Sequence, residues 1–122
     1  MDDRRTSLIL LTYKGKVLLM YRSDSAIDVQ KHEWCLIGGE KGKDESFEEA
    51  MTRRVEKEAN IKIDEVEFVS KNCYHARLTD DNVNNIKREE RQLLDFFTLR
   101  EIQNLSLTEA TKQFIEKHGS LI

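Results

Sequence analysis

The sequence predicts an α/β protein, a single α/β/α sandwich in which helices cover both faces of a mixed sheet. The first observation is that several apolar runs lack alternating polar positions, which indicates strands buried on both sides. The second is that two segments with helical spacing of apolar residues lie between and after these runs. Strands before, between and after two helices are typical of this layering. The sheet should be mixed because it contains a hairpin and also longer crossover connections.

The first part of the chain is predicted to supply a hairpin and a short third strand. Apolar runs at 7–12 and 16–20 flank the turn-forming residues 13–15, which is typical of a hairpin. Residues 33–37 are a further strand candidate. This strand runs into the glycine pair 38–39, which we expect to form a turn ahead of the first helix.

The clearest helical pattern covers residues 46–60. Ser46 and Glu49 have the spacing of a capping box, and Asn60 suits a left-handed terminator. Apolar residues recur three and four positions apart and form one stripe: Phe47, Ala50, Met51, Val55 and Ala59. A second helix is predicted over 106–118, where a serine and a glutamate three residues later again form a capping box.

The remaining segments complete the predicted fold. We expect one or two strands over 61–78, a late strand over 93–99 and a short helical turn over 100–105. Polar composition predicts loops at 22–32 and 79–92. The sequence shows no internal repeat, low-complexity tract or linker, so residues 1–122 are expected to form one domain.

Composition excludes several classes of protein. The chain has 122 residues, of which 39% are hydrophobic, enough for one compact core. Its formal net charge of −3 argues against binding to a nucleic acid polymer or an anionic membrane. No apolar run reaches membrane-spanning length, and the N-terminus has no apolar signal core. Cys35 and Cys73 lie far apart without metal-ligand spacing, so we expect reduced thiols in a cytoplasmic protein.

Residues 39–61 carry a long spaced motif, G-x5-E-x7-R-E-U-x-E-E-x-G-U, where U is a bulky aliphatic residue. The chain keeps it at Gly39, Glu45, Arg53, Val55, Glu58 and Ile61 and departs from it at Arg54, Lys57 and Asn60. This motif resembles the Nudix box of the MutT-like hydrolases. The predicted hairpin, Trp34 and the segment EERQLLDFF at 89–97 resemble the same family. The resemblance therefore covers nearly the whole chain and implies a Nudix-type α/β/α fold.

The resemblance also implies a metal site on one face of the first helix. Positions 54, 57 and 58 share that face because they lie three and four residues apart. In the family, three glutamates there hold Mg²⁺ or Mn²⁺ over a diphosphate. Here Arg54, Lys57 and Glu58 change the formal charge of the face from −3 (three glutamates) to +1 (two cations and one carboxylate). At an effective dielectric constant of ~20, unit charges about 4 Å apart repel by roughly 4 kcal/mol, so metal binding should be weakened.

The resemblance implies a role for each site residue, and several have a plainer alternative. Catalytic carboxylates would be Glu45, Glu58 and Glu90, and metal ligands would be the Gly38 carbonyl, Glu58 and Glu90. Arg22 would meet substrate phosphates, and structural support would come from Arg53, paired with Glu45, and from Gly39. Arg54 and Lys57, which depart from the family pattern, are also expected to bind substrate phosphates because of their positive charge. Alternatively, Glu58 pairs with Arg54 along the helix, Glu90 is a solvated loop residue, and Arg22 is an inert strand end. Trp34 is expected to pack in the core rather than to stack on a nucleobase.

Two functions remain open on the sequence. The first is a Nudix hydrolase of a nucleoside diphosphate linked to another group, dependent on Mg²⁺ or Mn²⁺ and weakened by the loss of two box carboxylates. The second is a catalytically inactive Nudix-fold module that binds a nucleotide or another phosphorylated ligand. In that case Arg54 and Lys57 stand in place of the metal and no cofactor is needed. The sequence also leaves open a homodimer in which a second copy supplies carboxylates.

Overall fold

A computed structural model describes residues 6–22, 33–86 and 92–122 of the chain. Seven strands are present in these ranges: β1 (Thr6–Tyr13), β2 (Lys16–Arg22), β3 (Trp34–Cys35), β4 (Ile37–Glu40), β5 (Glu67–Ser70), β6 (Cys73–Arg77) and β7 (Gln92–Phe97). The helices of the same ranges are α1 (Phe47–Ala59), α2 (Asp80–Asn84), α3 (Leu99–Ile102) and α4 (Glu109–His118), followed by the 3₁₀ turn η1 (Gly119–Leu121).

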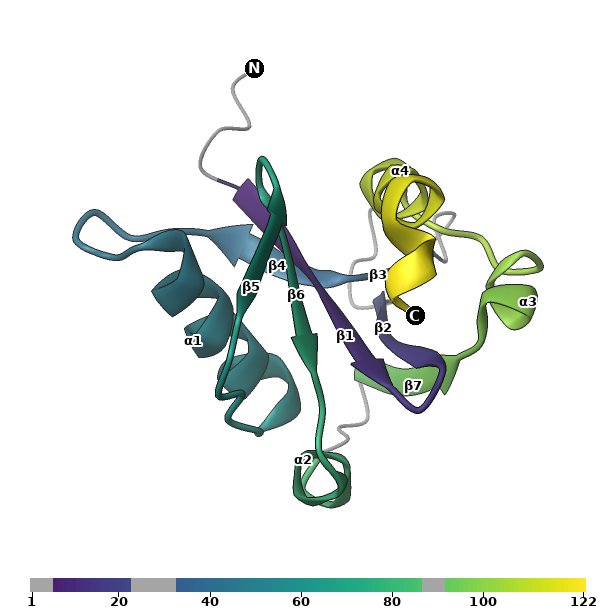
Figure 1. Ribbon diagram of the computed structural model, residues 1–122, viewed down its shortest axis with the longest axis horizontal. Coiled ribbons are helices and arrows are strands. Elements are labelled where there is room, and N and C mark those ends of the chain that lie inside the picture. The colour runs from purple at the N-terminus through teal and green to yellow at the C-terminus, as the bar shows by residue number, and fades with distance from the viewer. Residues whose placement is uncertain (1–5, 23–32, 87–91) are drawn as a thin grey trace.

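The strands form one mixed sheet between two layers of helices. The order is β3-β2-β1-β6-β5, with β4 also paired to β1 and β7 to β2. β1 and β6 are parallel, whereas the other paired strands are antiparallel. Figure 1 shows α1 on one side of the sheet and α3 and α4 on the other. The predicted α/β/α layering with a mixed sheet is therefore confirmed.

The predicted hairpin is present and turns over two residues. β1 and β2 pair with Tyr13 opposite Lys16. Lys14 and Gly15 both have positive φ, at 49° and 82°, as two-residue hairpin turns require. The Tyr13 hydroxyl donates to Asp80 Oδ1 at 2.6 Å, so the first residue of α2 is tied to the hairpin.

The core consists of two apolar clusters, one on each face of the sheet. Alternate residues of β1 belong to opposite clusters: Ile9 and Leu11 face α1, whereas Leu10 faces α4. The α1 cluster includes Leu18, Met20, Ala50, Met51, Val55 and Ala59. The α4 cluster includes Val17, Leu19, Leu36, Ile102, Phe114 and Ile115. Both sides of the central strands are buried, which explains why their sequences are continuously apolar.

The helix α1 has both predicted caps. The Ser46 hydroxyl accepts from the Glu49 N–H, and the Glu49 side chain accepts from the Ser46 N–H. Asn60 ends the helix with φ of 62° in the left-handed region. The predicted strands in 61–78 correspond to β5 and β6, and the predicted late strand corresponds to β7.

Two predictions about the helices are wrong. The segment 79–92 was expected to be a loop, but residues 80–84 form α2, because Thr79 and Asn82 make a reciprocal capping box. The last helix begins at Glu109 with Thr108 as its N-cap, not at Ser106. Residues 106–108 are extended because Trp34 pairs with them: its N–H donates to the Ser106 carbonyl at 2.8 Å, and its carbonyl accepts from the Thr108 N–H at 3.1 Å.

Candidate functional site

The glycine pair that opens the box lies in a strand, so the predicted glycine turn is wrong. Gly38 and Gly39 belong to β4 and pair with Leu8 and Ser7 of β1. Each glycine is required by a close contact. A Cβ on Gly38 would lie 2.3 Å from the Ser7 carbonyl oxygen and 2.6 Å from Leu8 Cδ2, and one on Gly39 would lie 2.7 Å from Arg54 Nε.

Arg54 fills the space that Gly39 leaves open and contacts two expected metal ligands. Its Nε donates to the Gly38 carbonyl oxygen at 3.1 Å. Its Nη2 lies 3.0 Å from Glu58 Oε2. The ion pair between Glu58 and Arg54, one helical turn apart, is therefore present, as the second interpretation of Glu58 predicted. The guanidinium bridges strand β4 and helix α1 at the point where the resemblance placed a divalent cation.

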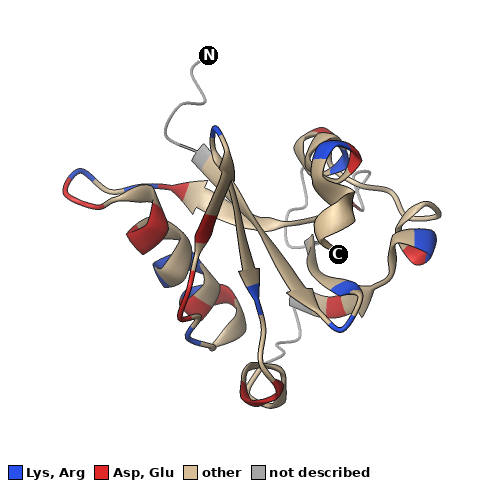
Figure 2. Ribbon diagram, in the orientation of Figure 1, with Lys and Arg blue, Asp and Glu red and all other residues tan. Residues whose placement is uncertain are grey.

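This ion pair is largely shielded from water. The Arg54 side chain is 21% exposed and the Glu58 side chain only 7%. A carboxylate this buried is costly without a partner, so the contact with Arg54 helps to stabilise the charge of Glu58. Lys57, on the same helix, is exposed. Figure 2 shows charges of both signs along α1.

Arg53 joins the loop after β4 to the helix. Its Nε donates to Glu45 Oε2 at 2.7 Å, and its Nη2 donates to Glu45 Oε1 at 3.0 Å and to the Glu40 carbonyl at 3.2 Å. The Gly42 N–H donates to Glu45 Oε1 at 2.6 Å. The hydrogen bonds from Arg53, and then that from Gly42, lower the pKa of Glu45 from 4.5 to about 2. The expected Arg53–Glu45 pair is thus present, and Glu45 is occupied in holding the loop.

Two predicted site groups cannot be placed. Glu90 lies outside the described residues. Arg22 ends β2, where its backbone pairs with Gln92, but its side chain is also outside the described part. Their predicted roles remain predictions.

The described residues do not fit a divalent metal at the box. Magnesium prefers several oxygen ligands. Of the oxygens that the resemblance offers here, the Gly38 carbonyl and the Glu58 carboxylate both bind the Arg54 guanidinium. In residues 6–22, 33–86 and 92–122 there is no group of three or more His, Cys, Asp or Glu side chains placed to hold a metal ion.

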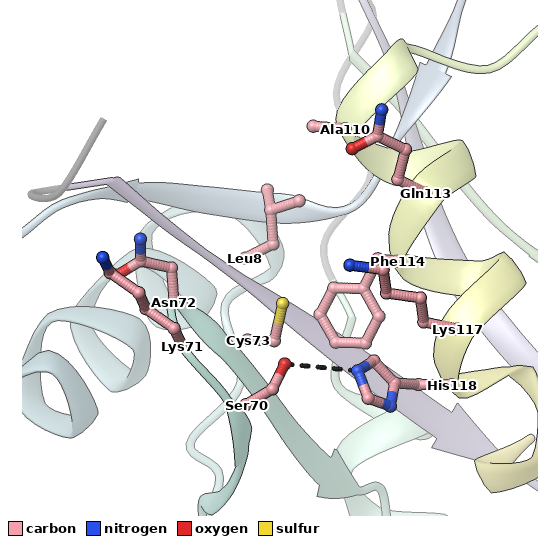
Figure 3. A pocket seen from close by; sticks show the side chains of 10 residues that line it. All are labelled: Leu8, Ser70, Lys71, Asn72, Cys73, Ala110, Gln113, Phe114, Lys117 and His118. Carbon is pink, nitrogen blue, oxygen red and sulfur yellow. Dashed lines mark hydrogen bonds between the residues drawn. The ribbon is translucent and has the colours of Figure 1, made fainter. Parts of the chain in front are cut away.

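A groove that the sequence did not predict lies on the α4 face of the sheet. It has a volume of about 590 Å³ and lies between the β5–β6 turn and α4. Its lining residues are Leu8, Ser70, Lys71, Asn72, Cys73, Ala110, Gln113, Phe114, Lys117 and His118. Figure 3 shows them, with the Ser70–His118 hydrogen bond of 3.2 Å joining the two walls. No sequence motif marks this groove, because its walls come from three separate segments of the chain.

The groove lies on the opposite face of the sheet from the box, with Gly38 between them. Leu8, which lines the groove, lies so close to Gly38 that a Cβ there would be 2.6 Å from Leu8 Cδ2. The carbonyl oxygen of the same glycine binds Arg54. Gly38 therefore lies between the groove, on the α4 face of the sheet, and Arg54, on the α1 face (Figure 1).

Trp34 and His75 pack against or hydrogen-bond neighbouring side chains of the fold. Trp34 packs between Tyr21 and Phe97, with ring centroids 5.0 and 4.8 Å away, which agrees with the predicted packing role. His75 is fully buried and hydrogen-bonds Thr12 through Nε2 at 2.9 Å. Its Nδ1 lies 3.0 Å from a Glu67 oxygen. The Thr12 hydroxyl is itself buried, so this chain of side chains does not present a nucleophile to solvent.

The fold and the box define a Nudix-type α/β protein, and comparison with known sequences gives the family. The NUDIX domain model matches residues 1–117, so the chain belongs to the Nudix family. No curated protein matches the sequence. No helix within the described residues is long and apolar enough to cross a membrane.

Solved structures share the fold at low sequence identity. A mutT/nudix family protein from Listeria innocua has a TM-score of 0.76 and 19% identity, covering 99% of this chain and 94% of that one. A MutT NUDIX hydrolase from Burkholderia pseudomallei has a TM-score of 0.74 and 20% identity, covering 94% and 97%. A NUDIX-family hydrolase from Clostridium perfringens has a TM-score of 0.71 and 15% identity, covering 100% and 99%.

Proposed function

We propose that this chain binds a nucleoside diphosphate linked to another group and hydrolyses it slowly. The observation that carries the proposal is the Arg54 guanidinium, which is held at the box by the Gly38 carbonyl oxygen and the Glu58 carboxylate. The diphosphate would lie over β4 near Arg54 and Lys57, on the face of the sheet that α1 covers. Family membership supplies the class of reaction.

The groove on the opposite face of the sheet has the size and chemistry to hold a second anionic ligand. Its volume of about 590 Å³ is within the range of small-molecule sites, ~300–1,000 Å³. Leu8, Cys73 and Phe114 provide apolar surface for a flat ring. Lys71 and Lys117 provide positive charge, and none of the described lining residues is acidic. The chain as a whole has a net charge of −3, so this local excess of cations favours an anionic ligand.

Hydrolysis would be slow because the box lacks the carboxylates that the family uses. Arg54 and Lys57 replace two of them, and the third, Glu58, is paired with Arg54. A solved structure with the same fold, at 18% identity and a TM-score of 0.63, is a UDP-X diphosphatase, a protein for a substrate of the proposed class. This likeness extends to the fold alone.

The alternative is a catalytically inactive module that binds a nucleotide or another phosphorylated ligand. The contacts of Arg54 favour it, because they leave the box without a free pair of metal ligands among the described residues. Both candidates use the same binding surface. They differ in whether product forms.

A hydrolysis screen separates them. Nucleoside diphosphate compounds would be incubated with Mg²⁺ or Mn²⁺ and either the wild type or the Arg54→Glu, Lys57→Glu double variant. Wild-type turnover equal to that of the double variant excludes the inactive module. Turnover seen only in the double variant supports it.

The groove is tested separately by binding. The Lys71→Ala, Lys117→Ala double variant should lose about tenfold or more in affinity for a bound compound, since two charge contacts are removed. Lys112→Ala is the matched control, because Lys112 lies on the same helix and does not line the groove. Equal affinities of all three proteins would place the ligand elsewhere.

A further inference from the structure

We propose that the Arg54 guanidinium is a built-in cation that takes the place of the family's divalent metal, so that the site holds a diphosphate without added metal. This inference deepens the proposed function and rests on it for the identity of the ligand. It follows from a disagreement: the family implies Mg²⁺ or Mn²⁺, whereas the described box residues do not fit a metal ion.

The contacts of Arg54 are those expected of a cation at the box. One guanidinium binds the Gly38 carbonyl oxygen at 3.1 Å and the Glu58 carboxylate at 3.0 Å. The resemblance implies three metal ligands, and the Gly38 carbonyl and Glu58 are the two that lie within the described residues. A metal would have to displace the guanidinium from both. It would also meet the second positive charge of Lys57.

The side chain is held in this place by its surroundings. The missing Cβ of Gly39 makes room for it, since a Cβ there would lie 2.7 Å from Nε, 3.1 Å from Cδ and 3.3 Å from Cγ of Arg54. Glu58, which is 7% exposed, fixes the far end of the guanidinium. Strand, helix and ion pair together restrict Arg54 to one position, so its charge is preorganised.

Arg54 retains donors for a ligand. A guanidinium carries five N–H groups, and the two contacts use one on Nε and one on Nη2. The other three have no partner among the described residues, and the side chain is 21% exposed. A planar fork of donors matches phosphate oxygens. Glu58 offsets one positive charge, and exposed Lys57 supplies another for the diphosphate.

The first test is titration with inorganic pyrophosphate, by calorimetry, in EDTA and again in Mg²⁺. The wild type should bind at least as tightly in EDTA as in Mg²⁺. Arg54→Gln should weaken binding in EDTA by about tenfold or more, since charge-assisted hydrogen bonds are lost. Arg100→Gln, on α3 and away from the box, is the control and should bind as the wild type does. Wild-type binding that requires Mg²⁺ overturns the inference.

The second test uses the metal alone and needs no ligand. Thermal unfolding would be followed with and without Mn²⁺ for the wild type, Arg54→Gln and Arg54→Glu. The wild type should change by less than about 1 °C, whereas Arg54→Glu should gain about 5 °C or more from a metal that binds only the folded state. If Arg54→Glu does not fold, Arg54→Gln takes its place, because it also removes the guanidinium from the Gly38 carbonyl and from Glu58. A wild-type gain equal to that of the variants overturns the inference.

The two proposals fail in different ways. A chain that binds pyrophosphate in EDTA but neither binds nor hydrolyses nucleoside diphosphate compounds contradicts the proposed function alone. A chain that hydrolyses such compounds with Mg²⁺ and binds pyrophosphate only with Mg²⁺ contradicts the role of Arg54 alone.

Discussion

Replacing Gly38 by alanine should strongly destabilise the protein, because the added methyl group meets backbone atoms. The Cβ would lie 2.3 Å from the Ser7 carbonyl oxygen, 2.6 Å from Leu8 Cδ2 and 3.2 Å from Leu8 Cα. Relaxed contacts are near ~3.5 Å, so β4 would have to move from β1 by roughly 1 Å. The paired register from Thr6–Glu40 to Ile9–Ile37 resists this movement. We expect a loss of about 3 kcal/mol in the free energy of unfolding, the upper end of overpacking effects.

Gly39→Ala is the matched comparison, since its Cβ would meet a side chain and not the backbone. The nearest atom is Arg54 Nε at 2.7 Å, which belongs to a side chain and is therefore displaced at lower cost than the backbone of β1. We expect a smaller loss, about 1 kcal/mol, which includes the disturbed contact with Glu58. In an Arg54→Ala background the same substitution should cost less than about 0.5 kcal/mol, because the clashing atoms are gone.

Urea unfolding monitored by the fluorescence of Trp34, the single tryptophan, measures these changes. For a chain of this length, about 3 kcal/mol corresponds to a fall in Tm of roughly 10 °C. The reasoning is refuted if Gly38→Ala stays within about 1 kcal/mol of the wild type, or if it is no more damaging than Gly39→Ala.

Three further predictions concern side chains that hold the scaffold. The pKa of Glu45 is lowered from 4.5 to about 2, mainly by the hydrogen bonds from Arg53. The ionised Glu45 carboxylate therefore stabilises the fold above pH 4.5, and this contribution is lost as the pH falls to 2. Stability of Glu45→Gln, measured by urea unfolding, should therefore fall less steeply than that of the wild type over this range; parallel curves would contradict it. Thr111→Val should lower the free energy of unfolding in urea by about 1–3 kcal/mol, because the buried Leu36 N–H loses the Thr111 hydroxyl as its acceptor. An unchanged urea midpoint would argue against this. Thr108→Ala should cost about 1 kcal/mol as a lost N-cap, while Ser106→Ala should stay within about 0.5 kcal/mol; the reverse order in thermal melts would restore Ser106 as the cap.

Local sequence was sufficient where a structure depends on near neighbours. The caps of α1 use residues within one helical turn, and the hairpin depends on its two turn residues, so both were predicted. The continuous apolar runs also predicted strands covered on both faces. The Arg53–Glu45 pair followed from the family motif and is formed.

Long-range contacts account for the wrong predictions. Ser106 has a local capping pattern, but backbone pairing with distant Trp34 keeps that segment extended, and Thr108 becomes the cap. The two box glycines resemble a turn in sequence, yet pairing with β1 makes them a strand. In both cases hydrogen bonds between distant segments outweigh a local preference.

By itself, the sequence determined the family, the layered fold and the charge reversal on one face of α1, because these depend on composition and spacing. Only the tertiary structure decided what the new charges touch. It brings the Gly38 carbonyl, the Arg54 guanidinium and the Glu58 carboxylate together, and it joins three separate segments into a groove on the opposite face of the sheet. Spacing along a helix predicts which residues share a face. It does not predict that Arg54 on this face contacts Gly38, a strand residue sixteen positions earlier in the chain.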